Sequence, residues 1–107
     1  MGATYEFPVL DYVSVTADSY SLTAGSSTTV RCSAGYEGTA YYQWSYSTDP
    51  SFRGAVTFAQ RRTSATFTPP GSGTYYVRCY VKITKNGQSV DGSDYTSISV
   101  SSPVIAP

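Results

Sequence analysis

Two cysteines, Cys32 and Cys79, each stand in a run of alternating polar and apolar residues, and the only tryptophan, Trp44, stands in a third such run between them. Alternation with a period of two is typical of half-buried β-strands, because successive side chains point to opposite faces of a sheet. All three residues belong to the inward set of their runs. The pattern therefore predicts a two-sheet sandwich whose core holds the indole against the two cysteines.

The two cysteines could form a disulfide bridge, remain as a pair of free thiols, or provide half of a metal site. The chain contains no histidine, so a four-ligand zinc site lacks ligands. We expect no metal or cofactor and favour a Cys32–Cys79 bridge. In the chain-entropy model such a bridge stabilises the fold by about 4 kcal/mol. It also implies an oxidising compartment, so we expect the protein to be secreted or at a cell surface.

Clusters of glycine, proline, serine and aspartate divide the chain into about seven short strands, as in a sandwich with Greek-key connections. The predicted strands are residues 12–16, 28–34, 39–47, 55–60, 64–68, 74–85 and 95–100. Asn86-Gly87 follows the longest of these and is a strong signal for a two-residue hairpin turn. The sequence therefore predicts an all-β fold without helix.

A chain of 107 residues is long enough for one domain. We expect an N-terminal extension or linker with a cloning remnant at 1–9, the domain at 10–101, and a proline-bearing linker at 102–107. No apolar run is long enough to span a bilayer, so an export signal or anchor is expected in sequence outside this chain. The expected partners are neighbouring domains of the same polypeptide.

Three segments resemble the immunoglobulin-like modules of large bacterial surface and secreted proteins: Tyr42-Gln43-Trp44, Ala65-Thr66-Phe67-Thr68-Pro69-Pro70, and Gly73-Thr74-Tyr75-Tyr76-Val77-Arg78-Cys79. The chain is also similar to polycystic-kidney-disease and fibronectin type III modules. The resemblance covers roughly residues 10 to 101 and implies an immunoglobulin-like β-sandwich with one inter-sheet disulfide. Val77 stands where antibody domains carry a corner tyrosine, so Tyr75 is expected to take that role in the core.

The function that the resemblance implies is a non-catalytic spacer, adhesion or recognition module. The residues agree with the absence of catalysis, because there is no histidine base and both glutamates, Glu6 and Glu37, are expected at a terminus or in a loop. Lys82 and Lys85 are expected in solvent. Lys plus Arg and Asp plus Glu each number 7, so no long-range field attracts nucleic acid or an anionic membrane. We expect a monomer.

The 11 tyrosines exceed what a core of this size can bury, so some must be exposed. If Cys79 points inward, Tyr76, Arg78 and Tyr80 lie on the outer face of its strand. Tyr41 and Gln43 lie on the outer face of the strand that carries Trp44. Two interpretations remain open: aromatic pairs that stabilise the sheet, which we favour, or a face that binds a glycan or a protein.

Asp91 and Asp94 flank Gly92-Ser93 in an expected loop. Two carboxylates with Asp49 as a third resemble part of a calcium ligand set, since calcium takes six to eight oxygens. A turn in which the aspartates accept hydrogen bonds from backbone N–H groups is the favoured interpretation.

Overall fold

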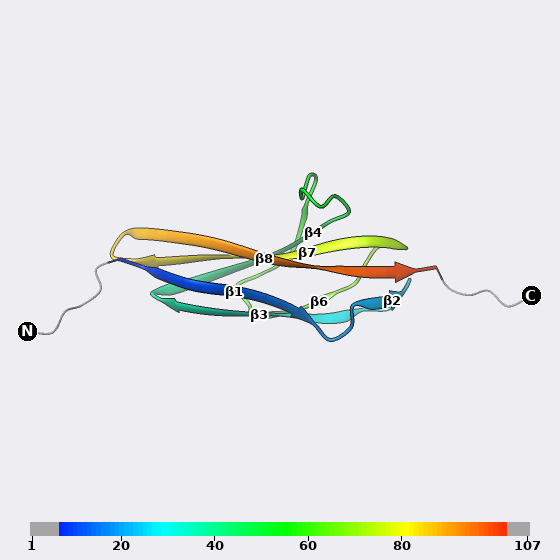
Figure 1. Ribbon diagram of the computed structural model, residues 1–107, viewed down its shortest axis with the longest axis horizontal. Coiled ribbons are helices and arrows are strands. Elements are labelled where there is room, and N and C mark those ends of the chain that lie inside the picture. The colour runs from blue at the N-terminus through cyan, green and yellow to red at the C-terminus, as the bar shows by residue number, and fades with distance from the viewer. Residues whose placement is uncertain (1–6, 103–107) are drawn as a thin grey trace, which may run out of the picture.

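The computed structural model describes residues 7–102, which form eight β-strands in two sheets (Figure 1). The predicted tails at 1–9 and 102–107 lie largely outside the described residues. The described part contains no helix that is long and apolar enough to cross a membrane. The strands are β1 (Val9–Ala17), β2 (Ser21–Thr23), β3 (Thr28–Glu37), β4 (Thr39–Ser47), β5 (Val56–Gln60), β6 (Ser64–Phe67), β7 (Gly73–Lys85) and β8 (Gln88–Ser101).

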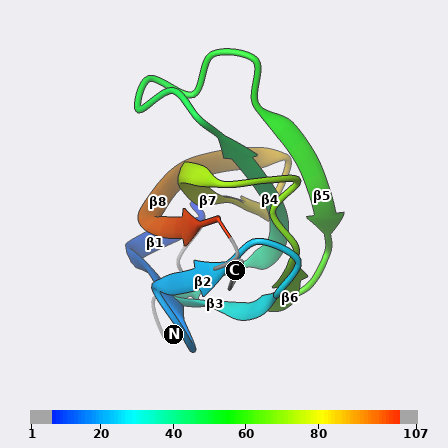
Figure 2. The ribbon, with the colours of Figure 1, turned by 90° about the vertical axis from the view of Figure 1, so that its right-hand side faces the viewer.

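The two sheets face each other as a sandwich (Figure 2). The small sheet has the order β1-β3-β6, and the large sheet has the order β2-β8-β7-β4-β5. Neighbouring strands run antiparallel except β2, which pairs in parallel with the end of β8. The prediction of an all-β sandwich is confirmed, with one more strand than expected.

The core lies between the sheets and is built by the alternation seen in the sequence. Trp44, Val77, Cys79, Val81 and Ile83 have no exposed surface. The other buried apolar residues are Val15, Leu22, Val30, Cys32, Tyr42, Ala65, Phe67, Tyr75, Ile98 and Val100. The odd-numbered residues of β7 from Tyr75 to Ile83 face inward, as the pattern predicts, because side chains alternate along a strand.

The last strand, β8, has 14 residues and is more than twice as long as the strand predicted at 95–100. The hairpin prediction at Asn86-Gly87 is confirmed: both residues have positive φ angles, 51° and 75°, and Lys85 lies opposite Gln88. Positive φ at both central positions is the geometry of a primed turn, whose backbone twist matches the right-handed twist of the two strands that it joins. The expectation of a loop at 91–94 is therefore wrong, and these residues pair with β7.

The chain enters the sandwich at one end and leaves it at the other (Figure 1). Val9, at the start of β1, lies opposite Glu37, at the end that also holds the β7–β8 turn. β8 runs from that turn to the far end, where Ser101 pairs with Thr23 of β2. With 14 residues, β8 spans about 43 Å at the usual rise of a strand.

Candidate functional site

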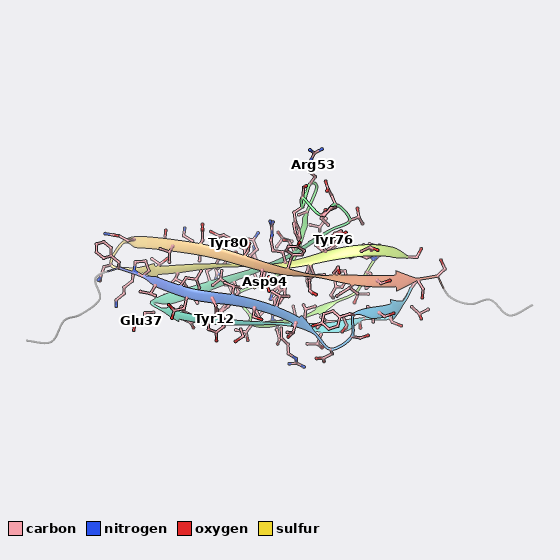
Figure 3. All side chains as sticks on the ribbon, viewed as in Figure 1. Tyr12, Glu37, Arg53, Tyr76, Tyr80 and Asp94 are labelled. Atoms are coloured by element: carbon pink, nitrogen blue, oxygen red, sulfur yellow. The ribbon has the colours of Figure 1, made fainter. Side chains whose placement is uncertain are left out.

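The five residues of the predicted outer face lie on two neighbouring strands of the large sheet. Tyr41 and Gln43 belong to β4, and the even-numbered residues Tyr76, Arg78 and Tyr80 belong to β7. Gln43 lies directly opposite Tyr80 in the β4–β7 pair. Tyr76 and Tyr80 project from the upper face in Figure 3. These five side chains therefore lie on one surface of the large sheet.

One half of this face is covered by Phe52, which comes from the loop between β4 and β5. The Phe52 ring lies 5.5 Å from the Tyr95 ring and 6.4 Å from the Tyr76 ring, each in an edge-to-face arrangement. The Arg78 guanidinium carbon lies 4.3 Å from the centre of the same ring. These four side chains are called the Phe52 cluster below. Aromatic pairs and cation–π contacts of this kind are stabilising.

The loop that carries Phe52 is held in place by its own hydrogen bonds. The buried Ser47 hydroxyl donates to the Arg53 carbonyl at 2.7 Å and accepts from the Asp49 N–H at 3.0 Å. Asp49 Oδ1 accepts from the Ser51 N–H at 2.9 Å, an Asx turn. The Phe52 φ of 59° is a rare conformation for a side chain of this size. The loop therefore holds Phe52 against the outer face of the large sheet, and Arg53 lies at the tip of the loop (Figure 3).

The other half of the face is polar and its groups bond to one another. The Tyr41 hydroxyl donates to Gln43 Oε1 at 3.1 Å, and Gln43 Nε2 donates to the Thr57 hydroxyl at 3.3 Å. The Tyr80 hydroxyl donates to Asp91 Oδ2 at 3.0 Å. Desolvation and this hydrogen bond raise the pKa of Tyr80 above its ordinary value. The outer face thus consists of a covered apolar half and a hydrogen-bonded polar half.

The two cysteines and Trp44 meet in the core. Cys32 on β3 and Cys79 on β7 are both buried and free, so the predicted bridge is not formed in this structure. The hydrogen bond between the thiols raises the pKa of Cys79, and burial adds to that effect. The same hydrogen bond lowers the pKa of Cys32. Trp44 lies opposite Cys79 in the β4–β7 pair.

Tyr75 lies near the start of β7, four residues before Cys79. Its ring is buried, and its hydroxyl donates to the Gly71 carbonyl at 3.0 Å. The bond joins the start of β7 to the turn that precedes it, because Gly71 lies four residues upstream. This is the hydrogen bond that a corner tyrosine makes.

Asp91 and Asp94, the pair that resembles part of a calcium ligand set, accept hydrogen bonds in different parts of the molecule. Asp91 binds Tyr80 on the outer face, whereas Asp94 Oδ2 accepts from the Val15 N–H of β1 at 2.8 Å. An odd spacing along a strand places two side chains on opposite faces. Within residues 7–102 no group of three potential metal ligands comes together.

A groove that the sequence did not reveal lies beside Tyr41. Its volume is about 650 Å³, and it is lined by Thr39, Ala40, Tyr41, Tyr42, Arg61, Arg62, Thr63 and Ser64. The lining comes from the start of β4 and from the link between β5 and β6. Two adjacent arginines in a link between strands were the signal present in the sequence, but only the fold places them next to Tyr41.

The chain matches no protein-family model, no curated protein and no solved structure.

Proposed function

We propose that this chain is an immunoglobulin-like module that spaces or joins neighbouring domains of a larger extracellular protein, without catalysis of its own. The resemblance to modules of bacterial surface and secreted proteins supports this proposal, and three structural features support it independently.

The first feature is the division of strands between the sheets. Constant-type immunoglobulin domains place their first, second, fourth and fifth strands in one sheet and their third, sixth and seventh strands in the other. Leaving aside the short β2, the strands β1, β3 and β6 correspond to the former group and β4, β7 and β8 to the latter. The described residues form no counterpart of the fourth strand in the small sheet. β5 extends the second sheet beside β4, as an added strand does in variable-type domains.

The second feature is the set of core residues and their strands. The cysteines stand on β3 and β7, the tryptophan on β4, and the corner tyrosine on β7. These are the strands that carry the inter-sheet disulfide, the packed tryptophan and the tyrosine corner in immunoglobulin domains. On this basis we propose that Cys32 and Cys79 form a disulfide in the oxidising compartment where the protein acts.

The third feature, and the observation that carries the spacer function, is the path of the chain. β1 begins at one end of the sandwich and β8 finishes at the other (Figure 1). Domains joined through opposite ends extend an array by the length of each sandwich. A module with both termini at one end would fold the array back on itself.

The test is X-ray solution scattering of two copies joined head to tail, with the single copy as the control. The maximum dimension of the tandem protein should exceed that of the single copy by about 43 Å, the length of β8. A tandem protein that gains less than half of this length would contradict a spacer function, because its two copies would pack side by side.

A second candidate function, a binding face for a glycan or a protein, is favoured by Tyr95, a member of the Phe52 cluster that is 52% exposed. Much of that face is already occupied, since Phe52 lies over Tyr76 and Arg78. A glycan and protein array with the Tyr76→Ala, Tyr80→Ala double variant tests this candidate. Binding that a folded double variant loses would favour it, and equal binding by both proteins would exclude this face.

A further inference from the structure

Hydrogen bonds hold the backbone that lines one side of the groove beside Tyr41. The Arg61 N–H donates to the Tyr42 carbonyl at 2.7 Å, and Trp44 Nε1 donates to the Arg62 carbonyl at 2.9 Å. One residue further on, the Cys32 N–H donates to the Thr63 carbonyl at 2.7 Å. The link between β5 and β6 is thus tied to β4 of the large sheet and to β3 of the small one.

The side chains of this link are exposed, whereas its backbone is hydrogen-bonded to both sheets. Arg61, Arg62, Thr63 and Ser64 are all exposed. Arg61 has a φ of 62°, a conformation that costs free energy for a residue other than glycine and is often found where a side chain serves a function. A fixed backbone reduces the entropy that is lost when exposed side chains bind a ligand.

The groove is positively charged in a chain that has no net charge. Its lining includes both arginines and no acidic residue. Neither Arg61 nor Arg62 makes an ion pair within the described residues, whereas Arg31 pairs with Asp18 and Arg53 with Asp49. The guanidinium group of an arginine is planar and presents two parallel N–H donors, which match the two oxygens of a carboxylate.

The remaining lining suits a sugar ring. Thr39, Thr63 and Ser64 supply hydroxyl groups, which both donate and accept hydrogen bonds as the hydroxyls of a saccharide do. Tyr41 adds an aromatic side chain. The volume of about 650 Å³ lies within the range of about 300–1,000 Å³ that is usual for small-molecule sites. Two positive groups in a neutral protein favour a ligand of low charge over a polyanion such as nucleic acid.

We propose that this groove binds a saccharide that carries a carboxylate, with Arg61 and Arg62 on the carboxylate and the hydroxyl groups on the ring. The site does not depend on the spacer function, and it uses a surface distinct from the Phe52 cluster.

The test is an NMR titration with N-acetylneuraminic acid and with glucuronic acid, each compared with its uncharged methyl ester and with inorganic sulfate. The matched variants are Arg61→Gln with Arg62→Gln, and Arg53→Gln as the control at an exposed arginine outside the groove. A thermal unfolding midpoint for each variant establishes that it is folded.

We expect at least one acid to shift the amide signals of residues 39–42 and 61–64, with at least tenfold weaker binding in the Arg61, Arg62 variant and unchanged binding in the Arg53 variant. The ester and sulfate should bind at least tenfold more weakly than the acid. The proposal is overturned if neither acid shifts these signals at millimolar concentration or if the ester binds as well as the acid. Sulfate binding equal to that of the acid would also overturn it, because the site would then recognise an anion without its sugar.

Discussion

The carboxylate of Asp94 on β8 accepts a hydrogen bond from the backbone N–H of Val15 on β1 at 2.8 Å. Val15 lies opposite Cys32 in the small sheet, and Asp94 lies opposite Cys79 in the large sheet. The bond therefore joins the two sheets beside the two cysteines. β1 is an edge strand of the small sheet and pairs with β3 along one side. On its other side, the bond to Asp94 gives the Val15 N–H a partner. This protects the edge, because unpaired strand edges can associate with other chains.

The contribution of this bond is measured by Asp94→Ala. The variant leaves the Val15 N–H without its charged acceptor, so we expect the free energy of unfolding to fall by about 1–3 kcal/mol. Asp91→Ala is the matched control, because Asp91 is exposed and its hydrogen bond from the Tyr80 hydroxyl lies on the outer face; its effect should stay below about 1 kcal/mol. Chemical denaturation compares them, and equal losses in both variants would show that the inter-sheet bond does not stabilise the fold.

Gly38, between β3 and β4, permits a close approach to β7. A Cβ atom at this position would lie 2.7 Å from Ile83 Cγ2 and 2.8 Å from the Thr84 carbonyl oxygen, and the φ of 128° is itself unfavourable for other residues. Gly38→Ala should lower the free energy of unfolding by about 2–4 kcal/mol. Gly71→Ala, which meets no atom within 4 Å, should change it by less than about 0.5 kcal/mol. A Gly38→Ala protein as stable as the Gly71→Ala protein would be inconsistent with the observed packing.

The contact between Phe52 and Arg78 predicts an energetic coupling. A double-mutant cycle with Phe52→Ala and Arg78→Gln isolates the pair from the other contacts of each side chain. We expect a coupling of about 0.5–1 kcal/mol, the usual size of a cation–π contact near the surface. Additive effects of the two substitutions would mean that the loop does not hold Phe52 over Arg78 in solution.

The raised pKa of Tyr42 predicts that the folded protein loses stability in alkaline solution. Desolvation, a hydrogen bond with Tyr36 and nearby ionisable groups raise the pKa of Tyr42 from 10.0 to about 12. The folded protein therefore keeps the phenol proton at a pH where the unfolded chain has lost it. The stabilising contribution is complete below about pH 10 and is lost as the pH rises toward about 12.

Denaturation curves across this range should show that Tyr42→Phe weakens the dependence of the unfolding free energy on pH. An unchanged pH dependence in the variant would assign the alkaline loss to other groups.

The strands that build the core could be predicted because their signal is local. In β7, Val77, Val81 and Ile83 alternate with polar residues, and the observed burial follows that alternation. The first half of β8 lacks such a pattern, since Asp91, Gly92 and Asp94 are typical of turns. Pairing with β7 through the hairpin turn outweighs these local preferences.

The Phe52 cluster and the groove could not be predicted from local patterns, since each joins segments that are distant in the chain. An apolar Phe52 between Pro50 and Gly54 does not by itself identify Tyr76, Arg78 and Tyr95 as the residues that it contacts. Nothing near Asp94 in the sequence indicates Val15 as its partner, because that bond spans 79 residues. Such contacts follow from the packing of the two sheets, not from the periodicity of either.

The most direct test of the immunoglobulin-like assignment is the mass of the folded protein after secretion through an oxidising compartment, measured with and without reductant. The assignment predicts a mass two hydrogens lower before reduction, a peptide that joins Cys32 to Cys79, and no alkylation of the folded protein. Two alkylatable thiols in folded, oxidised protein would contradict the assignment and, with it, the proposed extracellular function.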